Sequence, residues 1–426
     1  MFFFSLDDPE KGKNTMIDFY SNEADWERMR IGPLGLHVNG FARWLSVQGY
    51  GHKTGQAKIR LAADFSHWLN ERHLEVKDVT EEQVARFLKA RKQQCRWRPR
   101  HSQSLMQLLE YLRQIDILAE PVVAVSDHPR DQLLEQYAAY LKEQRGLQQL
   151  TIDKYLPVAR RFLVARVDGQ CLRLGRLQVK DITGFLLADD PQQSLSRTQL
   201  TAGVLRSFLG FLTQTGKLAV NLAVSVPPVA NRRWSRVPAF LEKVQVEQLL
   251  SSCDQACPTG RRDHAVLLLV ARLGLRAGEV ANLNLEQIDW EAGEIYVRGK
   301  SAREERLPLL PEVGQAIAGY LRRDRPASPC RRVFLRLSAP HQGFSSAGAI
   351  AHIVRSALTR AQLDPPQKGA HLLRRSLATH MLSHGASLHQ IGQILRHKRA
   401  QTTELYAKVD VTALRALAQP WPGGVQ

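Results

Sequence analysis

The sequence predicts a mainly α-helical protein with a small antiparallel β-sheet in its C-terminal domain, an α+β fold preceded by tandem helical N-terminal domains. Apolar residues recur at helical spacing in the middle of the chain, at Leu134, Tyr137 and Leu141 and again at Tyr155 and Phe162. The chain has 426 residues, and at about 150 residues per domain that length corresponds to two to four domains. We therefore expect several helical domains, and the motifs described below imply the sheet in the last one.

An internal repeat divides the first half of the chain. The segment "LEVKDVT" begins at Leu74 and "LQVKDIT" begins 103 residues later at Leu177. Upstream, Gly49 recurs 97 residues later as Gly146, and downstream "LLEYLRQIDIL" parallels "FLGFLTQTGKL". Because loop insertions produce unequal offsets of this kind, the sequence predicts two helical units of common ancestry. Chance similarity between amphipathic helices is the alternative.

The repeat and a proline-rich segment set the expected domain boundaries. The segment "VSVPPVANRRWSRVP" is basic and contains adjacent prolines, which resist helix and sheet, so we interpret it as an exposed linker. The expected organisation is an N-terminal extension at 1–24, a helical unit at 25–120, a second helical unit at 128–220, a linker at 221–237, a C-terminal domain at 238–415 and a tail at 416–426.

Composition favours a polyanionic partner. The chain carries 59 Lys+Arg against 41 Asp+Glu, a formal net charge of +18, which suits nucleic acid or an anionic membrane surface. A membrane is the weaker alternative, because no apolar run approaches the roughly 20 residues of a spanning helix. The start "MFFFSLDDPEKGK" also lacks the basic and long apolar stretches of a signal peptide. We therefore expect a nucleic acid as partner and no membrane, and the resemblance described below implies that the partner is double-stranded DNA and the protein cytoplasmic and nucleoid-associated.

Two basic segments are candidates for contacts with DNA phosphates. The segment "ARKQQCRWRPRHSQ" in the first unit contains no acidic residue, and the linker holds further arginines. A basic run is equally typical of a solvated face, and Trp97 within it could cover the core of the repeat. The candidate DNA-binding residues are Arg91, Lys92, Arg96, Arg98, Arg100, Arg232, Arg233 and Arg236.

The five cysteines do not form a ligand set for a metal ion. Cys253 and Cys257 make a lone C-x3-C with no second pair close to it in the sequence. Zinc sites are typically built from two such pairs, so we expect no metal. Reduced thiols in a cytosolic chain fit this pattern best.

Six polar residues in the last third of the chain carry the strongest functional signal. Arg276 lies in "ARLGLRAGEVANL", after an apolar run that reads as a core helix, and Lys300 lies in "IYVRGKSAREERLPL". The segment "HLLRRSLATHMLSHGASLHQIGQILRHKRAQTTELY" holds the other four, His371, Arg374, His397 and Tyr406. Their spacing places two imidazoles, a guanidinium and a phenol on short consecutive helices, where they could surround one phosphodiester.

Together these motifs resemble the catalytic domain of tyrosine recombinases, the class of phage integrases and Xer-type recombinases, over about residues 238–415. In that family an Arg follows Gly-Leu, a Lys lies on a β-hairpin, an HxxR pair follows, and the nucleophilic Tyr comes nine residues after a second His. Two departures are visible, Arg396 where the family usually has Gly and Arg375 where a His is frequent. The second helical unit resembles the helical core-binding (SAM-like) domain that precedes the catalytic domain in this family.

The resemblance and the charges imply roles for the two arginines. A phosphodiester under attack gains negative charge on its nonbridging oxygens, which guanidinium forks match with paired hydrogen bonds. Arg276 and Arg374 are therefore the expected clamp, with Glu279 orienting Arg276. The structural alternative is a helix-surface pair of Arg276 with Glu279, worth only about 0.2–0.5 kcal/mol.

The remaining residues would form and break bonds and move protons. Tyr406 is the expected nucleophile, and because a phenol has a pKa near 10 it needs a base, for which His371 is the candidate. His397 would hold a nonbridging oxygen, and Lys300 would protonate the leaving 5′ oxygen. The structural alternatives are a solvated hairpin tip for Lys300, a phosphate-contacting basic run for His397 and a core or interface tyrosine for Tyr406.

These expectations describe a site-specific DNA recombinase/integrase or a tyrosine transposase of a mobile element, acting through a 3′-phosphotyrosyl intermediate. No metal or other cofactor is expected, because the phosphotyrosine bond conserves the energy of the cleaved phosphodiester. Strand exchange between two duplexes implies a homo-tetramer, or a hetero-tetramer with a related recombinase. The alternatives are a type IB topoisomerase, which uses a similar constellation as a monomer, and a catalytically silent DNA-binding accessory protein.

Overall fold

The structure is a computed structural model. It describes residue 19 and residues 27–94, 98–119, 128–164, 167–168, 171–172, 174–188, 194–229, 237–298, 304–397 and 399–409. Some of the residues singled out in the sequence lie outside the described residues, namely Arg96, Trp97, Arg232, Arg233, Arg236 and Lys300. The expected tail at 416–426 and most of the expected extension at 1–24 also lie outside them. Within the described ranges, none of the helices has the length and apolar character needed to cross a membrane.

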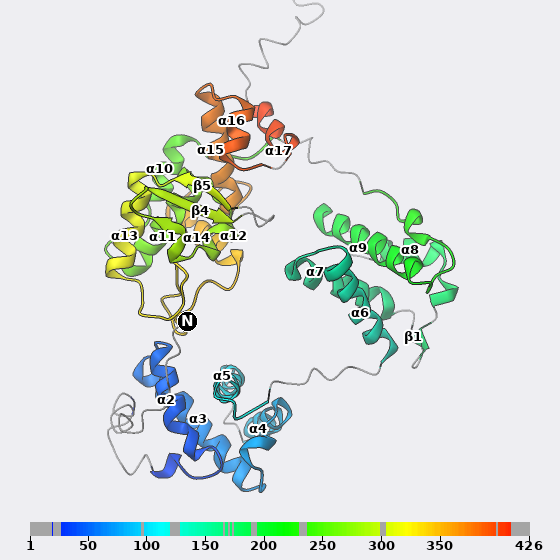
Figure 1. Ribbon diagram of the computed structural model, residues 1–426, viewed down its shortest axis with the longest axis vertical. Coiled ribbons are helices and arrows are strands. Elements are labelled where there is room, and N and C mark those ends of the chain that lie inside the picture. Colours follow the sequence, from blue (N-terminus) through cyan, green and yellow to red (C-terminus); the bar gives the residue numbers. More distant parts are fainter. Residues whose placement is uncertain are drawn as a thin grey trace, which may run out of the picture. The chain divides into compact units, whose positions relative to one another are not determined.

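The chain divides into two compact units, residues 121–235 and residues 1–120 with 236–426. The latter unit contains two large hydrophobic cores in its described residues, one built from residues 19–118 and one from residues 241–373, and a smaller apolar cluster around Ala378 and Leu395. We therefore describe three modules, each by itself: a first module at 27–119, a second at 128–229 and a third at 237–409 (Figure 1).

The first module is helical throughout its described residues. Helix α4 begins after Thr80, whose side chain accepts a hydrogen bond from the Gln83 N–H at 3.4 Å, and Glu81 and Glu82 occupy its first turn. Both features stabilise a helix start. The elements are η2 (Gly35–His37), α2 (Val38–Val47), α3 (His52–Asn70), η3 (Val76–Asp78), α4 (Glu81–Gln93) and α5 (His101–Gln114).

The described residues of the second module also form four α-helices, with different short elements between and after them. A two-residue antiparallel hairpin, β1 with β2, follows α7 and was not expected from the sequence. The elements are α6 (Pro129–Ala139), the π-helical turn η4 (Tyr140–Gln144), α7 (Gln149–Val164), β1 (Val167–Asp168), β2 (Cys171–Leu172), η5 (Leu174–Arg176), α8 (Val179–Leu187), α9 (Leu195–Gln214) and η6 (Leu222–Ser225).

The sequence repeat reappears as repeated local geometry. Gly49 and Gly146 both have a positive φ, +81° and +59°, in the turn that leads to the second helix of each module. Asp78 and Asp181 each accept a hydrogen bond from the backbone N–H three residues earlier, at 3.0 and 2.9 Å. These pairs are 97 and 103 residues apart, so the two modules make the same turns at the matching positions of the repeat.

The ends of the last helices in the two modules also match. The carbonyl oxygen of Leu112 accepts hydrogen bonds from the N–H groups five and six residues later, and the carbonyl of Leu212 does the same. In both turns the chain changes direction at a residue with positive φ, which is Asp116 in the first module and Gly216 in the second. This is the geometry of a helix C-cap with a left-handed residue.

The expected linker starts later than the sequence suggested. Its first residues form η6, and the side chains of Leu222 and Val226 are buried in the core of the second module. The turn is local: the Asn221 side chain accepts a hydrogen bond from the Ala223 N–H at 3.1 Å. The contacts continue to Val229, which packs against the same core, and the Pro227 carbonyl accepts a hydrogen bond from Arg206 at 2.7 Å, so residues 221–229 belong to the second module.

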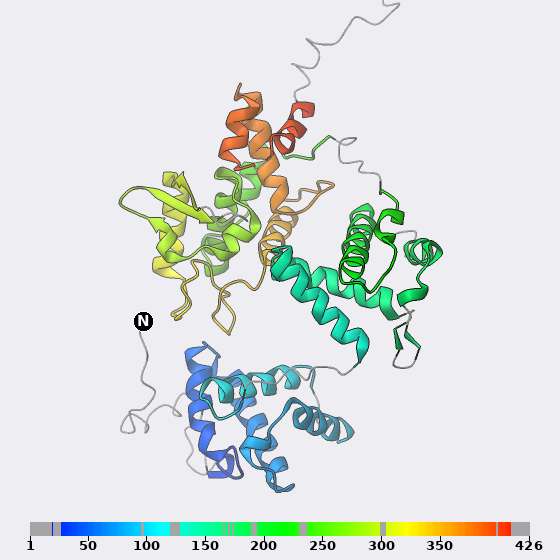
Figure 2. The same cartoon turned by 45° about the vertical axis from the view of Figure 1, so that its right-hand side comes forward.

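The third module surrounds a buried helix. Pro258 occupies the first turn of α11, where its missing N–H costs nothing, and the apolar run Ala265–Ala271 is buried along the rest of the helix. The helices are α10 (Lys243–Ser251), α11 (Pro258–Arg272), α12 (Ala277–Asn282), η8 (Leu285–Gln287), α13 (Pro311–Arg323), α14 (Ala347–Arg360), α15 (Ala370–Ser383), α16 (Leu388–Ile394), α17 (Gln401–Glu404) and η9 (Leu405–Val409). Helices α15, α16 and α17 gather at one end of this module (Figures 1 and 2).

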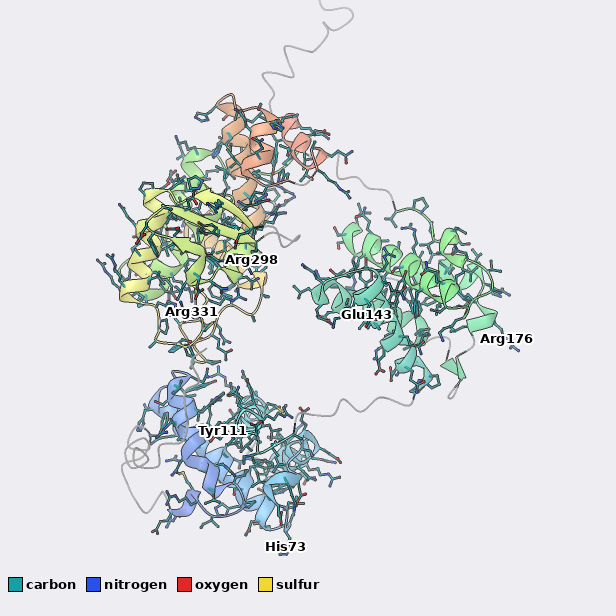
Figure 3. All side chains as sticks on the ribbon, in the orientation of Figure 1. His73, Tyr111, Glu143, Arg176, Arg298 and Arg331 are labelled. Atoms are coloured by element: carbon teal, nitrogen blue, oxygen red, sulfur yellow. The ribbon has the colours of Figure 1, made fainter. Side chains whose placement is uncertain are left out.

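The expected sheet is present in the third module. Within the described residues it is antiparallel with strand order β3 (Ile288–Asp289), β4 (Glu294–Arg298) and β5 (Glu304–Pro308). Ile295 pairs with Leu307 and Arg298 with Glu304, so the register places residues 299–303 between β4 and β5. Arg298, marked in Figure 3, also forms an ion pair with Glu304 at 3.3 Å. The α+β prediction for this part of the chain is confirmed.

Candidate active site

Arg276 is fixed by the turn between α11 and α12. Gly274 in this turn has φ +59°, and a Cβ there would lie 2.7 Å from the Leu395 side chain, so both conformation and space favour glycine. Arg276 then caps α12: its backbone N–H donates to one Glu279 carboxylate oxygen at 2.8 Å and its Nη1 donates to the other at 2.6 Å. Glu279 is buried, so this pair is not the surface contact considered as the structural alternative.

Arg374 is buried in α15, with 3% of its surface exposed. Its Nη1 donates to the carbonyl oxygen of Gly274 and its Nη2 to that of Leu395. Burial lowers the pKa of Arg374 to about 10, and the positive charges of Arg276 and Arg396 act in the same direction. The guanidinium therefore stays charged at neutral pH, and it keeps further N–H groups for a ligand because an arginine has five.

His371 lies one turn before Arg374, in the first turn of α15, and is exposed. Residues three apart share a helix face, so the HxxR spacing directs both side chains toward the same side. The charge of His371 is among the causes that lower the pKa of His397, which requires the two imidazoles to be near each other.

Arg396 is the third guanidinium of the site. Its backbone is left-handed, with φ +55°, a conformation that costs a residue other than glycine roughly 1–2 kcal/mol. Its side chain is 4% exposed and donates from Nη2 to Glu279 at 2.6 Å, while Nε lies 3.2 Å from Glu305. The carbonyl oxygen of Arg396 accepts a hydrogen bond from Arg276 Nη2 at 2.7 Å.

His397 and Tyr406 stack on each other. Their ring centroids are 6.3 Å apart with an angle of 11° between the planes, and His397 Nδ1 lies 2.8 Å from Thr403 Oγ1. Tyr406, in η9, is 5% exposed and packs in a small apolar cluster with Ala378 and Leu395. The short helix α17 contains Thr403, which hydrogen-bonds His397, and leads to Tyr406, whose ring stacks on His397.

Burial lowers the pKa of His397 to about 4, and the positive charges of Arg374 and Arg276 contribute further. Because the folded-state pKa lies well below the usual 6.5, the imidazole is uncharged at neutral pH and takes up a proton only when the pH falls toward 4. An uncharged imidazole has one N–H and one lone pair, so it can donate one hydrogen bond and accept another.

A groove of about 1180 Å³ opens beside this cluster. Strand β5 contributes Glu305, Arg306 and Leu307 to its walls, and α16, α17 and the segment that contains Arg396 and His397 contribute the rest. Among the residues that the structure describes, no three His, Cys, Asp or Glu side chains are grouped so that they could hold a metal ion.

The candidate DNA-binding residues of the first module divide into two kinds. Lys92, Arg98 and Arg100 are exposed. Arg91 instead forms an ion pair with Asp64 at 2.6 Å, and its side chain is only 16% exposed. The structure therefore leaves the first three available to a partner and engages Arg91 within its own module.

Two residues of the site did not emerge as functional from the sequence. Arg396 was noted only as a departure from the usual glycine, although a charged residue in a glycine position is itself a signal for a new interaction. Thr403 gave no signal except its place one turn before Tyr406 in "TTELY".

Comparisons with known proteins identify the family of the chain. Residues 239–412 match the profile of the Phage integrase family. "Putative integrase/recombinase y4rA" of Sinorhizobium fredii (strain NBRC 101917 / NGR234) is 41% identical over 399 residues, which cover 93% of this chain and 96% of the relative. The chain belongs to the phage integrase family of tyrosine recombinases. "Tyrosine recombinase XerC" of Lactobacillus delbrueckii subsp. bulgaricus (strain ATCC BAA-365 / Lb-18) is 28% identical over 291 residues, covering 66% of this recombinase and 96% of the relative.

Solved structures show the same fold. The XerH site-specific recombinase bound to the palindromic difH substrate, in a post-cleavage complex, matches with a TM-score of 0.53 and 17% identity, over 74% of this chain and 94% of that one. A dimer of lambda integrase (75–356) bound to a COC′ core site matches with a TM-score of 0.51 and 14% identity, over 69% and 98%. The predicted recombinase family and its fold are confirmed.

Proposed function

We propose that this tyrosine recombinase cleaves and rejoins double-stranded DNA at specific sites through a 3′-phosphotyrosyl intermediate on Tyr406. The observation that carries the proposal is the convergence of three contacts on residues 395–397. Arg276 and Arg374 bind the carbonyl oxygens of Arg396 and Leu395, and His397 stacks on the Tyr406 ring. One short segment therefore holds two guanidiniums, an imidazole and a phenol around a common point.

The charges at this point suit a phosphodiester in the act of transfer. Arg276 and Arg374 would bind the nonbridging oxygens, where negative charge increases as the phenol attacks. The role of Glu279 is to hold Arg276 by two hydrogen bonds, so that its remaining N–H groups face the phosphate. His371, exposed at the start of α15, is the base that accepts the Tyr406 proton.

His397 would act as an uncharged hydrogen-bond donor. Its pKa of about 4 keeps the imidazole neutral at neutral pH. If the Thr403 hydroxyl donates to Nδ1, the ring proton resides on Nε2, which can then donate to a nonbridging oxygen. Thr403 would thereby select the tautomer that catalysis needs.

Lys300 is the proposed general acid, and its test uses the leaving group. Lys300→Ala is expected to cleave normal DNA slowly but to recover on DNA with sulfur at the 5′ bridging position, because a thiolate leaves without a proton. Single-turnover cleavage rates on the two substrates measure this recovery. Arg276→Ala is the control and should stay slow on both, since it binds the phosphate itself. Equal defects of Lys300→Ala on both substrates would show that Lys300 has another role, such as binding DNA.

For the whole chain we propose that the second module is the core-binding domain, the third the catalytic domain, and the first an added DNA-binding module. Strand exchange between two duplexes breaks four strands, and with one nucleophile per chain this calls for a tetramer, of this chain alone or with a related recombinase. The lambda integrase structure that it resembles is a dimer on DNA, which supports DNA binding by several copies. We place the protein in the cytoplasm with the nucleoid.

The salt dependence of binding tests the first module. Each phosphate neutralised on duplex DNA adds about 0.9 to the log–log slope of affinity against salt. Replacing the exposed Lys92, Arg98 and Arg100 by alanine should therefore make the slope shallower by up to about 3 units and shorten the footprint. The control is Arg91→Ala, which removes a charge already paired with Asp64 and should leave the slope unchanged. An unchanged slope and footprint for the triple variant would indicate a protein-binding module instead.

A further inference from the structure

Arg396 closes a ring of interactions around the catalytic arginine. Its Nη2 donates to the Oε2 atom of Glu279, the Oε1 atom of Glu279 accepts from Arg276 Nη1, and Arg276 Nη2 donates to the carbonyl of Arg396 itself. Both distances to Glu279 are 2.6 Å, and Glu279 and Arg396 are buried. The ring joins the start of α12 to the segment before His397, 120 residues later in the chain.

The same guanidinium also contacts the hairpin. Its Nε lies 3.2 Å from Glu305 on β5. Strand β5 pairs with β4 in a register that puts Glu305 opposite Val297, and Lys300 follows β4 by two residues. Among the described residues this ion pair joins β5 to residues 395–397, whose carbonyl oxygens bind Arg276 and Arg374.

The backbone of Arg396 strengthens this interpretation. Its φ of +55° is the conformation that glycine adopts readily and that the tyrosine recombinases usually satisfy with glycine. An arginine in this conformation is destabilising by itself, and two carboxylates around the buried side chain offset that cost. Only Nη2 of this side chain makes a hydrogen bond, to Glu279, because Nε and Nη1 have no hydrogen-bond acceptor among the described residues. The contact of Nε with Glu305 is therefore an ion pair without hydrogen-bond geometry.

We propose that Arg396 is a positioning residue that couples the hairpin carrying Lys300 to the arginine clamp. Through Glu305 it holds strand β5, which follows Lys300 in the chain, and through Glu279 it holds Arg276. This inference rests on the proposed function. The glycine that is usual at this position could not take the role of Arg396, because glycine makes neither ion pair.

The first test compares Arg396→Gly on two substrates. Glycine suits the positive φ, so this variant should fold while losing both ion pairs. We expect cleavage of normal DNA to slow by about 10- to 100-fold, the range for small displacements of catalytic groups. The part of that defect that comes from the hairpin should disappear on DNA with 5′ bridging sulfur, the part that comes from Arg276 should remain, and DNA affinity should stay within about threefold. Arg396→Lys, which keeps the charge but cannot bridge two carboxylates with a planar fork, should show a smaller defect of the same kind.

Glu305→Gln supplies the reciprocal test. It should slow cleavage in the same sulfur-sensitive way, and the double variant with Arg396→Gly should be no slower than Arg396→Gly alone, because both remove one interaction. Glu294→Gln is the matched control on the same hairpin: its carboxylate pairs with Arg306, so it should leave cleavage unchanged. Additive defects, or equal defects on the oxygen and sulfur substrates, would overturn the coupling role.

A measurement without DNA separates this inference from the proposed function. Amide hydrogen exchange in β5 should become faster in Arg396→Gly than in the unaltered protein and stay unchanged in Glu294→Gln. Unchanged exchange in Arg396→Gly would overturn the coupling. Absence of any covalent adduct from the unaltered protein on either substrate would instead overturn the proposed function, whatever the exchange shows.

Discussion

Tyr406→Phe is expected to bind its DNA with unchanged affinity and to form no covalent adduct. The phenyl ring can keep the stacking on His397 and the buried packing, so the change removes only the hydroxyl that attacks phosphorus. A nicked suicide substrate, which loses a short strand after cleavage and cannot be religated, would trap a 3′-phosphotyrosyl adduct in the unaltered protein. Denaturing gels and peptide mapping of the adduct measure the outcome.

Tyr296→Phe is the matched control for this change. Tyr296 is on β4 of the same module, where its ring lies under Arg306 at 5.2 Å, and it has no role in the proposed chemistry. This variant should trap as much adduct as the unaltered protein. An adduct recovered with Tyr406→Phe, or mapped to another tyrosine, would contradict the assignment of the nucleophile.

Arg374→Ala is expected to lose about 10²- to 10³-fold in cleavage rate, the usual cost of one well-placed donor to a developing negative charge. It should also lower the free energy of unfolding, because the carbonyl oxygens of Gly274 and Leu395 would each lose a donor in a buried place. A buried polar group left without a partner costs about 1–3 kcal/mol. Single-turnover cleavage at saturating DNA and denaturant unfolding measure the two effects.

Two further variants separate catalysis from stability. Arg374→Lys keeps the charge but presents one compact ammonium, so it should recover part of the stability and little of the rate. Arg375→Ala removes the neighbouring arginine, whose guanidinium donates to Gln367, and should stay within about threefold of the unaltered rate. A cleavage rate for Arg374→Ala that matches Arg375→Ala would exclude Arg374 from the clamp. If the cleavage rate of Arg374→Ala recovers on the 5′ sulfur substrate, Arg374 would instead have a role in proton transfer.

The sequence by itself determined the features that depend on local spacing. The three-residue step from His371 to Arg374 fixes one helix face, and the core helix before Arg276 follows from a short apolar run. The repeat was equally visible, because the turns at Gly49 and Gly146 each need a residue that tolerates a positive φ. The sheet beside Lys300 was predicted too, through the resemblance of the motifs. Each of these features involves residues close together in the chain.

The linker and Arg91 show where local patterns are insufficient. The start of the linker was placed too early, because the burial of Leu222 and Val226 depends on the core that they meet and not on the prolines that follow. Arg91 looked like its basic neighbours in the sequence, yet it pairs with Asp64, 27 residues earlier, on another helix. Composition counts charges but does not reveal which of them are already paired.

Tertiary structure alone decided how the active site is held together. Arg396 meets Glu279 across 117 residues, and Arg374 meets the carbonyl of Gly274 across 100. The low pKa of His397 likewise comes from burial and from arginines on other helices. Motif spacing identifies the candidate catalytic groups, because each role in the reaction requires a particular type of side chain. Their partners, burial and protonation depend on which distant segments pack together, and only the folded chain supplies that.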